Sequence, residues 1–420
     1  MNIDALLSPK TCACGKIHSC NIQKVIIEKG ALNRIGQLCA DYSRILLVAD
    51  ENTYPLCGDS VLAQLGDKLE NNLIYKRNGI LVPNEDAIEE MEKCLTGATD
   101  LIIGIGSGVI QDLCKYVSFL HKLPYFIVAT APSMDGYASK GAAMIISNMK
   151  VTYNADVPAA IIGDVDILKT APMELIQAGY GDILGKYSCL NDWKLSHVVN
   201  SEYFCQEIYD LTYDMLLKTQ DLGPALLVRE EDAIQTLMEA LVGVGIAMAY
   251  AGNSRPASGS EHHLSHFFEV IGIMTGEPYL HHGTDVAFSA VYTQKMREAL
   301  LGINTPARAH DFDQNRWETS IRNIYGKAAQ GVIDLQNKLG WYQQDRLPVY
   351  KEKWAEICAV LAEVPSSNRL LAYLNSVGLD MDLFTATYTP EKIENALWVA
   401  KDLKDRYTVL WMYYELFRKY

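Results

Sequence analysis

The strongest constraint on the fold is an alternation of short apolar runs with helical stretches, which occupies the first 165 residues and then stops. Helical periodicity fills Asp86–Gly97 and Val109–His121. Runs typical of β-strands lie at Arg44–Ala49, Leu101–Ile105, Tyr125–Thr130 and Ala159–Ile162. Strands that are apolar along most of their length and alternate with helices form parallel sheets covered on both faces. The pattern therefore predicts an N-terminal α/β domain built on a parallel sheet.

After Ala171-Pro172 the strand-like runs almost vanish, and helical patterns continue to the end of the chain. They include Ile234–Tyr250, Arg316–Leu339 and Lys351–Leu361. We expect two domains, an α/β domain over residues 1–167 and an all-α domain over residues 168–420, with the active site in the cleft between them.

The net charge of −14 argues against a nucleic-acid or anionic-membrane binder, because contacts to phosphate backbones need clustered lysine and arginine. No secretory signal precedes Lys10, and the longest apolar stretch, Ala240–Ala251, is too short to cross a bilayer. The sequence predicts a cytoplasmic protein without membrane insertion.

One group of cysteines is unusual among the ten in the chain, which otherwise show no paired framework. Cys12, Cys14, His18 and Cys20 follow one another closely enough to hold zinc. The C-x-C spacing differs from the usual C-x2-C of structural zinc sites, and no second pair follows nearby. We favour a small N-terminal turn here, with a zinc site as the alternative.

A glycine-rich turn joins the strand Leu101–Ile105 to the next helix as Gly104-Ile-Gly106-Ser107-Gly108. Glycines let the backbone approach a diphosphate, and the helix N-terminus offers free N–H groups. We interpret the turn as part of a Rossmann-like dinucleotide site, although its G-x-G-x-G spacing differs from G-x-G-x-x-G. The alternative is a tight turn without a ligand.

Two further strand ends carry polar side chains. Asp50 follows the strand Arg44–Ala49, where a carboxylate can bind the ribose hydroxyls or serve as an ordinary turn residue. Thr130-Ala-Pro-Ser133-Met-Asp135-Gly136-Tyr-Ala-Ser139 follows another strand. Open α/β sheets bind ligands at this edge, although Pro-Ser-x-Asp-Gly also describes a plain turn.

Histidines are concentrated in one segment, with five of the nine between His262 and His282. His262 and His266 lie four apart and share one face of a helix. Two imidazoles and a carboxylate bind a divalent cation and leave coordination positions open, as a catalytic site needs. We favour His262 and His282 as ligands, and interpret His263 and His281 as structural.

Five motifs in order resemble the iron-containing alcohol dehydrogenase and dehydroquinate synthase superfamily, and within it the glycerol-1-phosphate dehydrogenases of the bacterial AraM-like branch. The motifs are GIGSGVIQD (104–112), TAPSMDGYAS (130–139), AGYGDILGKYSCLNDW (178–193), SRPASGSEHHLSH (254–266) and HHGTDVA (281–287). Many relatives have three glycines where this chain has Gly106-Ser107-Gly108.

The resemblance implies a role for each matching residue. Asp182, His262 and His282 would hold one divalent metal, zinc first and nickel or iron as alternatives. Asp135, Asp182 and His266 would contact the substrate, and we add Arg255 as a phosphate contact, with a purely structural arginine as the alternative. NAD(H), with NADP(H) as the alternative, would be bound by Asp50, Gly106, Gly108, Val109, Ile110, Gln111, Asp112, Thr130, Ala131, Pro132, Ser133 and Ser139.

The reaction that the resemblance implies is the reversible reduction of dihydroxyacetone phosphate to sn-glycerol 1-phosphate by a homo-oligomer, with a dimer favoured. His266 would donate the proton, with Asp135 as the runner-up. Three alternatives are a glycerol dehydrogenase-like enzyme, a dehydroquinate synthase-like cyclase and a non-catalytic nucleotide-binding relative. The chain has no obvious lysine cluster around the metal motifs, which a cyclase acting on a phosphorylated acid would need.

Overall fold

The computed structural model describes residues 3–77, 79–146 and 149–417. It contains two compact units, each assembled from two segments of the chain. The sheet unit comprises Met1–Ile183 and Leu217–Asn253, and the helical unit comprises Leu184–Leu216 and Ser254–Tyr420. The predicted order of a parallel-sheet α/β region followed by a mostly helical region is confirmed.

The sheet unit is built on six parallel strands in the order β3-β10-β7-β6-β4-β5. Their bounds are β3 Lys24–Glu28, β4 Ile45–Asp50, β5 Leu69–Tyr75, β6 Leu101–Gly106, β7 Tyr125–Ala129 and β10 Ala160–Asp164. Four of them match the predicted runs, while β3 and β5 lie at the two edges of the sheet and were not predicted.

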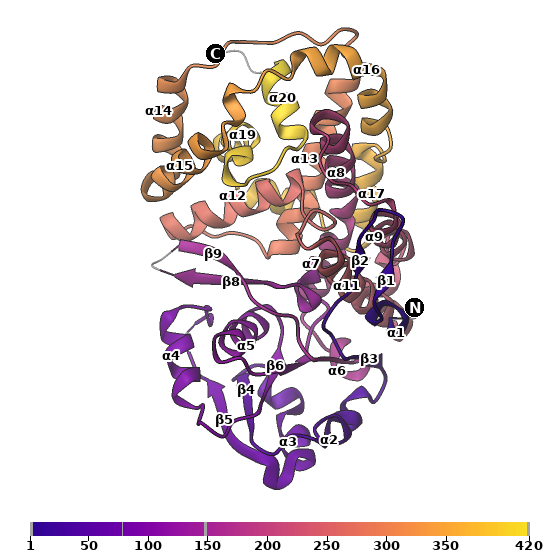
Figure 1. Ribbon diagram of the computed structural model, residues 1–420, viewed down its shortest axis with the longest axis vertical. Coiled ribbons are helices and arrows are strands. Elements are labelled where there is room, and N and C mark those ends of the chain that lie inside the picture. Colours follow the sequence, from indigo (N-terminus) through magenta and orange to yellow (C-terminus); the bar gives the residue numbers. More distant parts are fainter. Residues whose placement is uncertain (1–2, 78, 147–148, 418–420) are drawn as a thin grey trace. The chain divides into compact units, whose positions relative to one another are not determined.

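Helices cover both faces of this sheet (Figure 1). On one face, Ile103 and Val128 pack with Val61 and Leu65 of α3. On the other face, a Cβ atom on Gly104 would lie closest to Cys114 of α5, 2.8 Å from its sulfur. The covering helices are α2 Ile35–Leu38, α3 Tyr54–Leu65, α4 Glu85–Lys93 and α5 Gly108–His121, with the short 3-10 helices η1 Ala31–Arg34 and η2 Gly66–Lys68. Because both faces are buried, the central strands β4, β6, β7 and β10 are apolar along most of their length, as the sequence pattern indicates.

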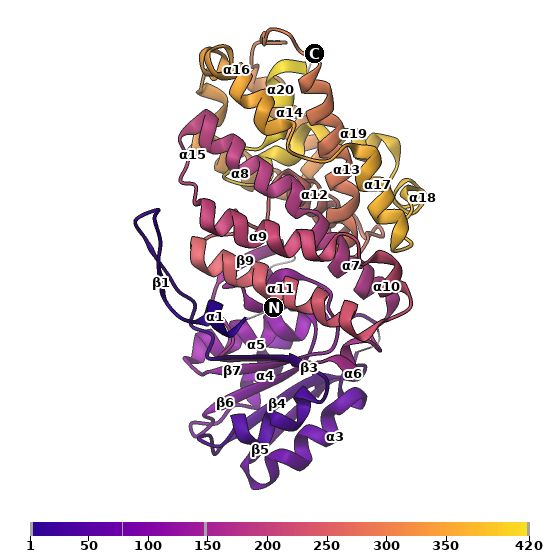
Figure 2. The same cartoon turned by 90° about the vertical axis from the view of Figure 1, so that its right-hand side faces the viewer.

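Smaller elements complete the sheet unit. A two-stranded hairpin follows the sheet strand β7, and another lies near the N-terminus. The bounds are α1 Asp4–Leu7, β1 Lys10–Thr11, β2 Ile17–His18, η3 Asp135–Ala138, β8 Gly141–Ile146, β9 Met149–Asn154, α6 Val165–Leu168, α7 Met173–Leu184, α10 Gly223–Leu227 and α11 Glu231–Ala251. Helix α11 runs beside β3 (Figure 2).

Helix α11 has the length and hydropathy of a membrane span, with 21 residues and a mean hydropathy of 1.5 over its most apolar window. The helix begins at Glu231 and is therefore longer than Ala240–Ala251, the apolar stretch identified in the sequence. Since 72% of that window is buried inside the protein, we interpret α11 as a core helix and not as a membrane span.

Two glycines let helices approach the loop that follows β7. A Cβ atom on Gly179 of α7 would lie 1.8 Å from the carbonyl oxygen of Pro132. A Cβ atom on Gly245 of α11 would lie 2.7 Å from the Cβ of Ala138. Both distances are too short for real carbon atoms, so only glycine permits these approaches.

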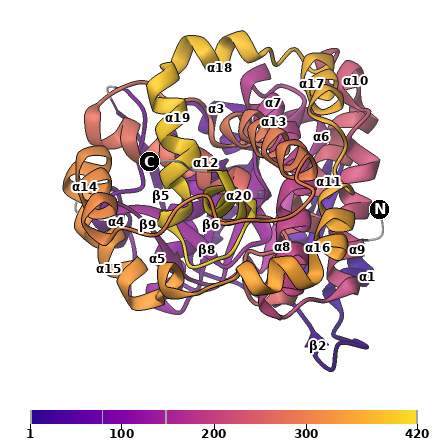
Figure 3. The same cartoon turned by 90° about the horizontal axis from the view of Figure 1, so that it is seen from above.

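The helical unit is a bundle in which α13, α19 and α20 pack together (Figure 3). Helix α9 (Gln206–Thr219) contributes to both units. The other bounds are α8 Lys186–Asn200, α12 Ser260–Thr275, α13 His282–Leu301, α14 Gln314–Tyr325, η4 Gly326–Ala328, α15 Ala329–Leu339, η5 Trp341–Gln343, α16 Leu347–Leu361, α17 Ser367–Ser376, α18 Met381–Thr387, α19 Pro390–Val399, η6 Ala400–Leu403 and α20 Val409–Phe417.

A fully buried ion pair lies at the centre of the helical unit. Asp192 of α8 and Arg297 of α13 are 2.8 Å apart, and both side chains are inaccessible to solvent. The same carboxylate accepts hydrogen bonds from the backbone N–H of Ser260 (2.7 Å) and of Val409 (2.9 Å). One carboxylate therefore holds the first turns of α12 and α20, together with α13, against α8.

We predict that Gly179→Ala lowers the free energy of unfolding by about 1–3 kcal/mol, because the added methyl group overpacks the contact between α7 and Pro132. The matched control is Gly331→Ala in α15, where a Cβ atom would meet nothing within 4 Å. Denaturant titrations of both variants measure the difference. An unchanged stability of Gly179→Ala would contradict the close packing of α7 on this loop.

Candidate functional site

The glycine turn after β6 forms the first part of the candidate site. A Cβ atom on Gly106 would lie 2.6 Å from the Cβ of Ile110, so a larger residue would not allow the chain to enter α5 here. The N–H of Thr130 donates to the carbonyl oxygen of Gly106 at 3.1 Å. This bond joins the ends of β6 and β7 at the carboxyl edge of the sheet, where parallel sheets bind nucleotides.

A pocket of about 220 Å³ opens at this edge of the sheet. Asp50, Val109 and Ile110, all predicted as cofactor contacts, line it together with Ser107. Arg77 also lines the pocket, and it was not predicted because no sequence pattern placed it near the glycine turn. The structure therefore brings the strand-end carboxylate and the glycine turn to one cavity.

Asp50 also organises its own turn. Its Oδ1 accepts hydrogen bonds from the N–H of Asn52 (2.9 Å) and from the N–H (2.8 Å) and hydroxyl (3.0 Å) of Thr53. Asp50 is therefore a turn residue, which the sequence left as the alternative. It also lines the pocket.

Gln111 and Asp112 support neighbouring loops. The Gln111 amide nitrogen donates to the Tyr125 hydroxyl (3.1 Å) and to the Tyr137 carbonyl oxygen (3.0 Å), and its side chain is fully buried. Oδ2 of Asp112 accepts from the N–H of Ala143 at 3.2 Å. These contacts position the 135–143 segment.

Lys115 is a functional candidate that the sequence did not reveal. Its buried ammonium donates to the carbonyl oxygens of Gly136 (3.0 Å) and Gly141 (2.8 Å), and to Oγ of Ser139 (3.4 Å). Burial lowers the pKa of Lys115, while Asp112, 3.6 Å away, acts in the opposite direction. Lys115 therefore holds the loop that carries the predicted cofactor contact Ser139.

The remaining loop residues predicted for the cofactor are buried beside it. Tyr137 donates its hydroxyl to the Ala131 carbonyl oxygen at 2.8 Å. The other members of this group are Thr130, Pro132 and Ser133, which precede η3 in the chain, and all are buried. Their placement at the carboxyl edge follows from the register of β7 beside β6.

Two of the predicted substrate contacts, Asp135 and Asp182, are in contact within the sheet unit. The backbone N–H of Asp135 donates to Oδ2 of Asp182 at 2.9 Å, and the Asp182 side chain is fully buried. Gly179, one turn earlier in α7, permits this approach by packing against Pro132. The loop after β7 therefore fixes the orientation of the Asp182 carboxylate.

Three predicted histidines meet in the helical unit. The ring centroids of His262 and His282 are 5.1 Å apart, those of His266 and His282 are 5.3 Å apart, and those of His262 and His266 are 6.0 Å apart. His262 and His266 share one face of α12, and His282 is the first residue of α13. The helical spacing of His262 and His266 therefore gives the neighbourhood expected from the sequence.

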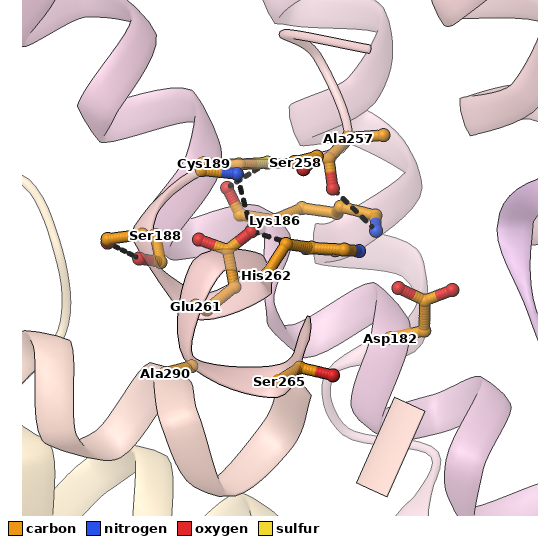
Figure 4. Close-up of polar contacts among 12 residues, drawn as sticks. Asp182, Lys186, Ser188, Cys189, Ala257, Ser258, Glu261, His262, Ser265 and Ala290 are labelled. Atoms are coloured by element: carbon orange, nitrogen blue, oxygen red, sulfur yellow. Dashed lines mark hydrogen bonds and ion pairs between the residues drawn. The ribbon is translucent and has the colours of Figure 1, made fainter. Parts of the chain in front are cut away.

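Hydrogen bonds to Nδ1 orient two of these rings. Nδ1 of His262 lies 2.6 Å from Oε1 of Glu261 (Figure 4). The same Oε1 accepts a hydrogen bond from the N–H of Gly259 at 2.8 Å. Nδ1 of His282 lies 3.3 Å from the hydroxyl of Ser265. Metal-bound histidines commonly use one nitrogen for such a partner and the other for the ion.

Glu261 was missed by sequence reasoning because nothing in the pattern indicates its burial. Burial is the largest influence on its carboxyl group and raises the pKa, while the N–H of Gly259 lowers it. The only available signal is its position directly before His262.

Other histidines and acids nearby differ in burial. His263 is fully buried, and burial lowers its pKa well below the usual range, whereas His281 is exposed and precedes α13. Glu269, one turn after His266, forms a second possible donor group with His266 and His282, with ligand atoms within 4.8 Å of one another. The helical unit thus supplies several imidazole and carboxylate donors in one region.

Arg255 makes the contacts of a structural arginine. Its guanidinium pairs with both carboxylate oxygens of Glu202, with an Nε to Oε1 distance of 2.6 Å, and donates to the Tyr407 carbonyl oxygen at 2.9 Å. A third contact joins it to the hydroxyl of Ser196 at 3.3 Å. Only 4% of the residue is exposed, so the predicted contact with a substrate phosphate gains no support from this arrangement.

Comparisons with known proteins agree on one family. Residues 26–172 match the model of the iron-containing alcohol dehydrogenase family. A glycerol-1-phosphate dehydrogenase (NAD(P)+) from Bacillus velezensis is 35% identical over 87% of this chain and 84% of its own. One from Geobacillus thermodenitrificans is 29% identical over 96% of this chain and 95% of its own.

Solved structures show the same fold at low sequence identity. An alcohol dehydrogenase from Oenococcus oeni has a TM-score of 0.58 and 15% identity, covering 90% of this chain and 92% of its own. A variant of an archaeal alcohol dehydrogenase from a Red Sea brine pool has a TM-score of 0.60 and 14% identity, covering 91% of both chains. The chain therefore belongs to the iron-containing alcohol dehydrogenases and, within them, to the glycerol-1-phosphate dehydrogenase family.

Proposed function

We propose that the protein is an NAD(P)-dependent glycerol-1-phosphate dehydrogenase that reduces dihydroxyacetone phosphate to sn-glycerol 1-phosphate and catalyses the reverse reaction. The observation that carries the proposal is the cluster of His262, His266 and His282 in a chain that aligns with enzymes of that name over nearly its full length. We also propose a cytoplasmic homo-oligomer, with a dimer favoured.

The proposed metal ligands are Asp182, His262 and His282. The donors suit a divalent ion, because the Nδ1 partners Glu261 and Ser265 leave the Nε2 atoms for coordination. Two imidazoles and one carboxylate suit zinc first, with nickel and iron as alternatives.

The proposed dinucleotide site lies at the carboxyl edge of the sheet. Support comes from the pocket lined by Asp50, Ser107 and Val109, and from the start of α5 directly after the glycine turn. We keep as a proposal the division expected from the sequence, in which residues 1–167 bind the dinucleotide and residues 168–420 bind the metal and the substrate, with Asp135 as a substrate contact from the first segment.

When bound, the metal would act as a Lewis acid on the C2 carbonyl group of the substrate, and the nicotinamide would supply the hydride. The side chains of the protein position the substrate and supply the proton for its C2 oxygen. In the proposal, His266 donates the proton that the C2 oxygen takes up, directly or through water, because an imidazole titrates near neutral pH. Asp135 orients the substrate, and its backbone N–H holds Asp182 in place.

We propose that Arg255 has a structural role and holds the loop before α12 in place. Its charge is already neutralised by the partly buried Glu202, and moving the guanidinium to a phosphate would leave that carboxylate without its cationic partner. In this proposal, donors other than Arg255 bind the substrate phosphate.

We predict that His262→Ala loses both bound metal and turnover, because one of two imidazole ligands is removed. The matched control is His281→Ala, an exposed histidine directly before His282, which should keep both. His263→Ala should also keep its metal. Metal content by mass spectrometry and the rate of cofactor oxidation measure the effect, and a full equivalent of metal in active His262→Ala would disprove the assignment.

Substrate choice tests the proposed activity itself. Cofactor oxidation should be at least about 100-fold more efficient in kcat/KM with dihydroxyacetone phosphate than with dihydroxyacetone, because two charge-assisted hydrogen bonds to the phosphate contribute about 3 kcal/mol. Glycerol should be a poor substrate for the reverse reaction. Equal rates on unphosphorylated substrates would indicate a glycerol dehydrogenase, and no turnover after addition of metal would indicate a non-catalytic relative.

We predict that Asp50 favours NADH over NADPH, because its carboxylate repels the 2′-phosphate. Asp50→Ser should reduce the ratio of kcat/KM with NADH to kcat/KM with NADPH by roughly 5- to 30-fold, which corresponds to about 1–2 kcal/mol. Because this substitution also removes the turn contacts of Oδ1, the stability of the variant is measured in parallel. A wild-type preference for NADPH would contradict the prediction, and Arg77 in the same pocket would then be the residue to change.

A further inference from the structure

A second group of metal-binding side chains lies far from the proposed metal ligands in the sequence. Cys12, Cys14 and His18 belong to the N-terminal hairpin of the sheet unit, and their sulfur and ring nitrogen atoms lie within 4.8 Å of one another. The proposed dehydrogenase reaction gives these residues no role.

The hairpin backbone brings the three side chains together. Strands β1 and β2 pair antiparallel, with Lys10 opposite His18. The turn closes through hydrogen bonds from the N–H of Cys12 to the Lys16 carbonyl oxygen and from the N–H of Gly15 to the Cys12 carbonyl oxygen, both 3.0 Å long. Gly15 has a φ of +83°, which favours glycine.

The hydrogen bonds around this group are those of a bound thiolate and a ligating imidazole. The N–H of Cys14 donates to Sγ of Cys12 at 3.4 Å, a contact that stabilises negative charge on sulfur. Nδ1 of His18 lies 3.2 Å from the Tyr250 carbonyl oxygen, which directs Nε2 to the other side of the ring. The ring of His18 also stacks on Tyr250, with centroids 5.5 Å apart.

The separation of donor atoms suits a tetrahedral ion. Nε2 of His18 lies 3.4 Å from Sγ of Cys14. Zinc bonds of about 2.3 Å to sulfur and 2.0 Å to nitrogen at a tetrahedral angle separate the two donors by about 3.5 Å. Cys14 and His18 therefore already have nearly the spacing of two zinc ligands, and the sulfur of Cys12 lies within 4.8 Å of both.

Burial and donor chemistry select the ion. His18 is 1% exposed and Cys12 is 7% exposed. Two thiolates and an imidazole, with no carboxylate in the group, suit Zn²⁺ and discriminate against Mg²⁺ and Ca²⁺.

We propose that Cys12, Cys14 and His18 bind a structural zinc ion, which fastens the N-terminal hairpin to α11 through the contacts of His18 with Tyr250. The fourth coordination position is taken by water or by a further side chain. This proposal does not depend on the proposed dehydrogenase activity, because none of the three residues belongs to that site.

Cys20 provides a matched control within the same segment. Its Sγ donates to the Leu6 carbonyl oxygen at 3.8 Å, and Cys20 does not belong to the group of donor atoms within 4.8 Å of one another. Cys20 therefore tests whether the loss of any nearby thiol has the same effect.

Cobalt substitution separates this site from the proposed catalytic one. The full-length protein is stripped with a chelator and loaded with Co²⁺, and the near-ultraviolet absorption of thiolate-to-cobalt charge transfer is measured. Asp182, His262 and His282 contain no sulfur, so only the N-terminal group produces this band. We expect the band in the wild type and in His262→Ala, with its strength corresponding to at least two thiolates.

Two cysteine variants test which side chains bind the ion. Cys14→Ser should lose the band and one equivalent of zinc per chain, while Cys20→Ser should keep both. Chelation should lower the melting temperature of the wild type more than that of Cys14→Ser, with circular dichroism confirming that the variant is folded. If Cys14→Ser does not fold, His18→Gln is measured in its place, with the same loss expected.

Three results would overturn the proposal. The first is a wild type without the charge-transfer band, and the second is a band of undiminished strength in Cys14→Ser. The third is a purified protein, kept under reducing conditions, in which Cys12 and Cys14 are joined as a disulfide and no zinc is bound.

Discussion

The contact between α7 and the loop after β7 is the constraint on which the candidate site depends. A helix can carry a buried carboxylate to the edge of a sheet only if its backbone comes close enough for a hydrogen bond. Gly179 provides that approach to Pro132, and the N–H of Asp135 then binds the carboxylate of Asp182. The orientation of Asp182 is therefore determined by the absence of a side chain one turn earlier.

The helical unit uses a different means to position its imidazoles. The buried pair of Asp192 and Arg297 holds the first turn of α12 through the N–H of Ser260, two residues before His262. Glu261 then fixes the ring of His262. The N–H groups of Ser260 and Val409 satisfy the Asp192 carboxylate oxygens, so these backbone contacts support the buried pair as well as α12. Rigid support of this kind is what a ligand histidine requires.

Much of the fold could be predicted because burial on both faces of a parallel sheet makes a strand apolar throughout, as in Leu101–Gly106. The edge strand β5 escaped prediction because it carries Glu70, Asn71 and Asn72, and the two asparagines are exposed. The histidine cluster followed from spacing along one helix, whereas Glu261 and Lys115 did not. The role of Glu261 arises from its burial, and that of Lys115 arises from partners 21 and 26 residues later in the chain, which no local pattern encodes. The same limitation explains Arg255, whose partner Glu202 lies 53 residues earlier in the chain.

Asp50 illustrates how a turn residue and a binding residue can be the same side chain. A carboxylate has two oxygens with about four lone-pair directions, so three hydrogen bonds to Oδ1 do not exhaust its capacity to accept. The turn fixes the carboxylate at the end of β4, and the pocket lies directly beside it. A ligand hydroxyl that binds there meets an acceptor whose rotamer is already fixed, which reduces the entropy lost on binding. The structural role of Asp50 therefore supports its proposed role in binding the ribose.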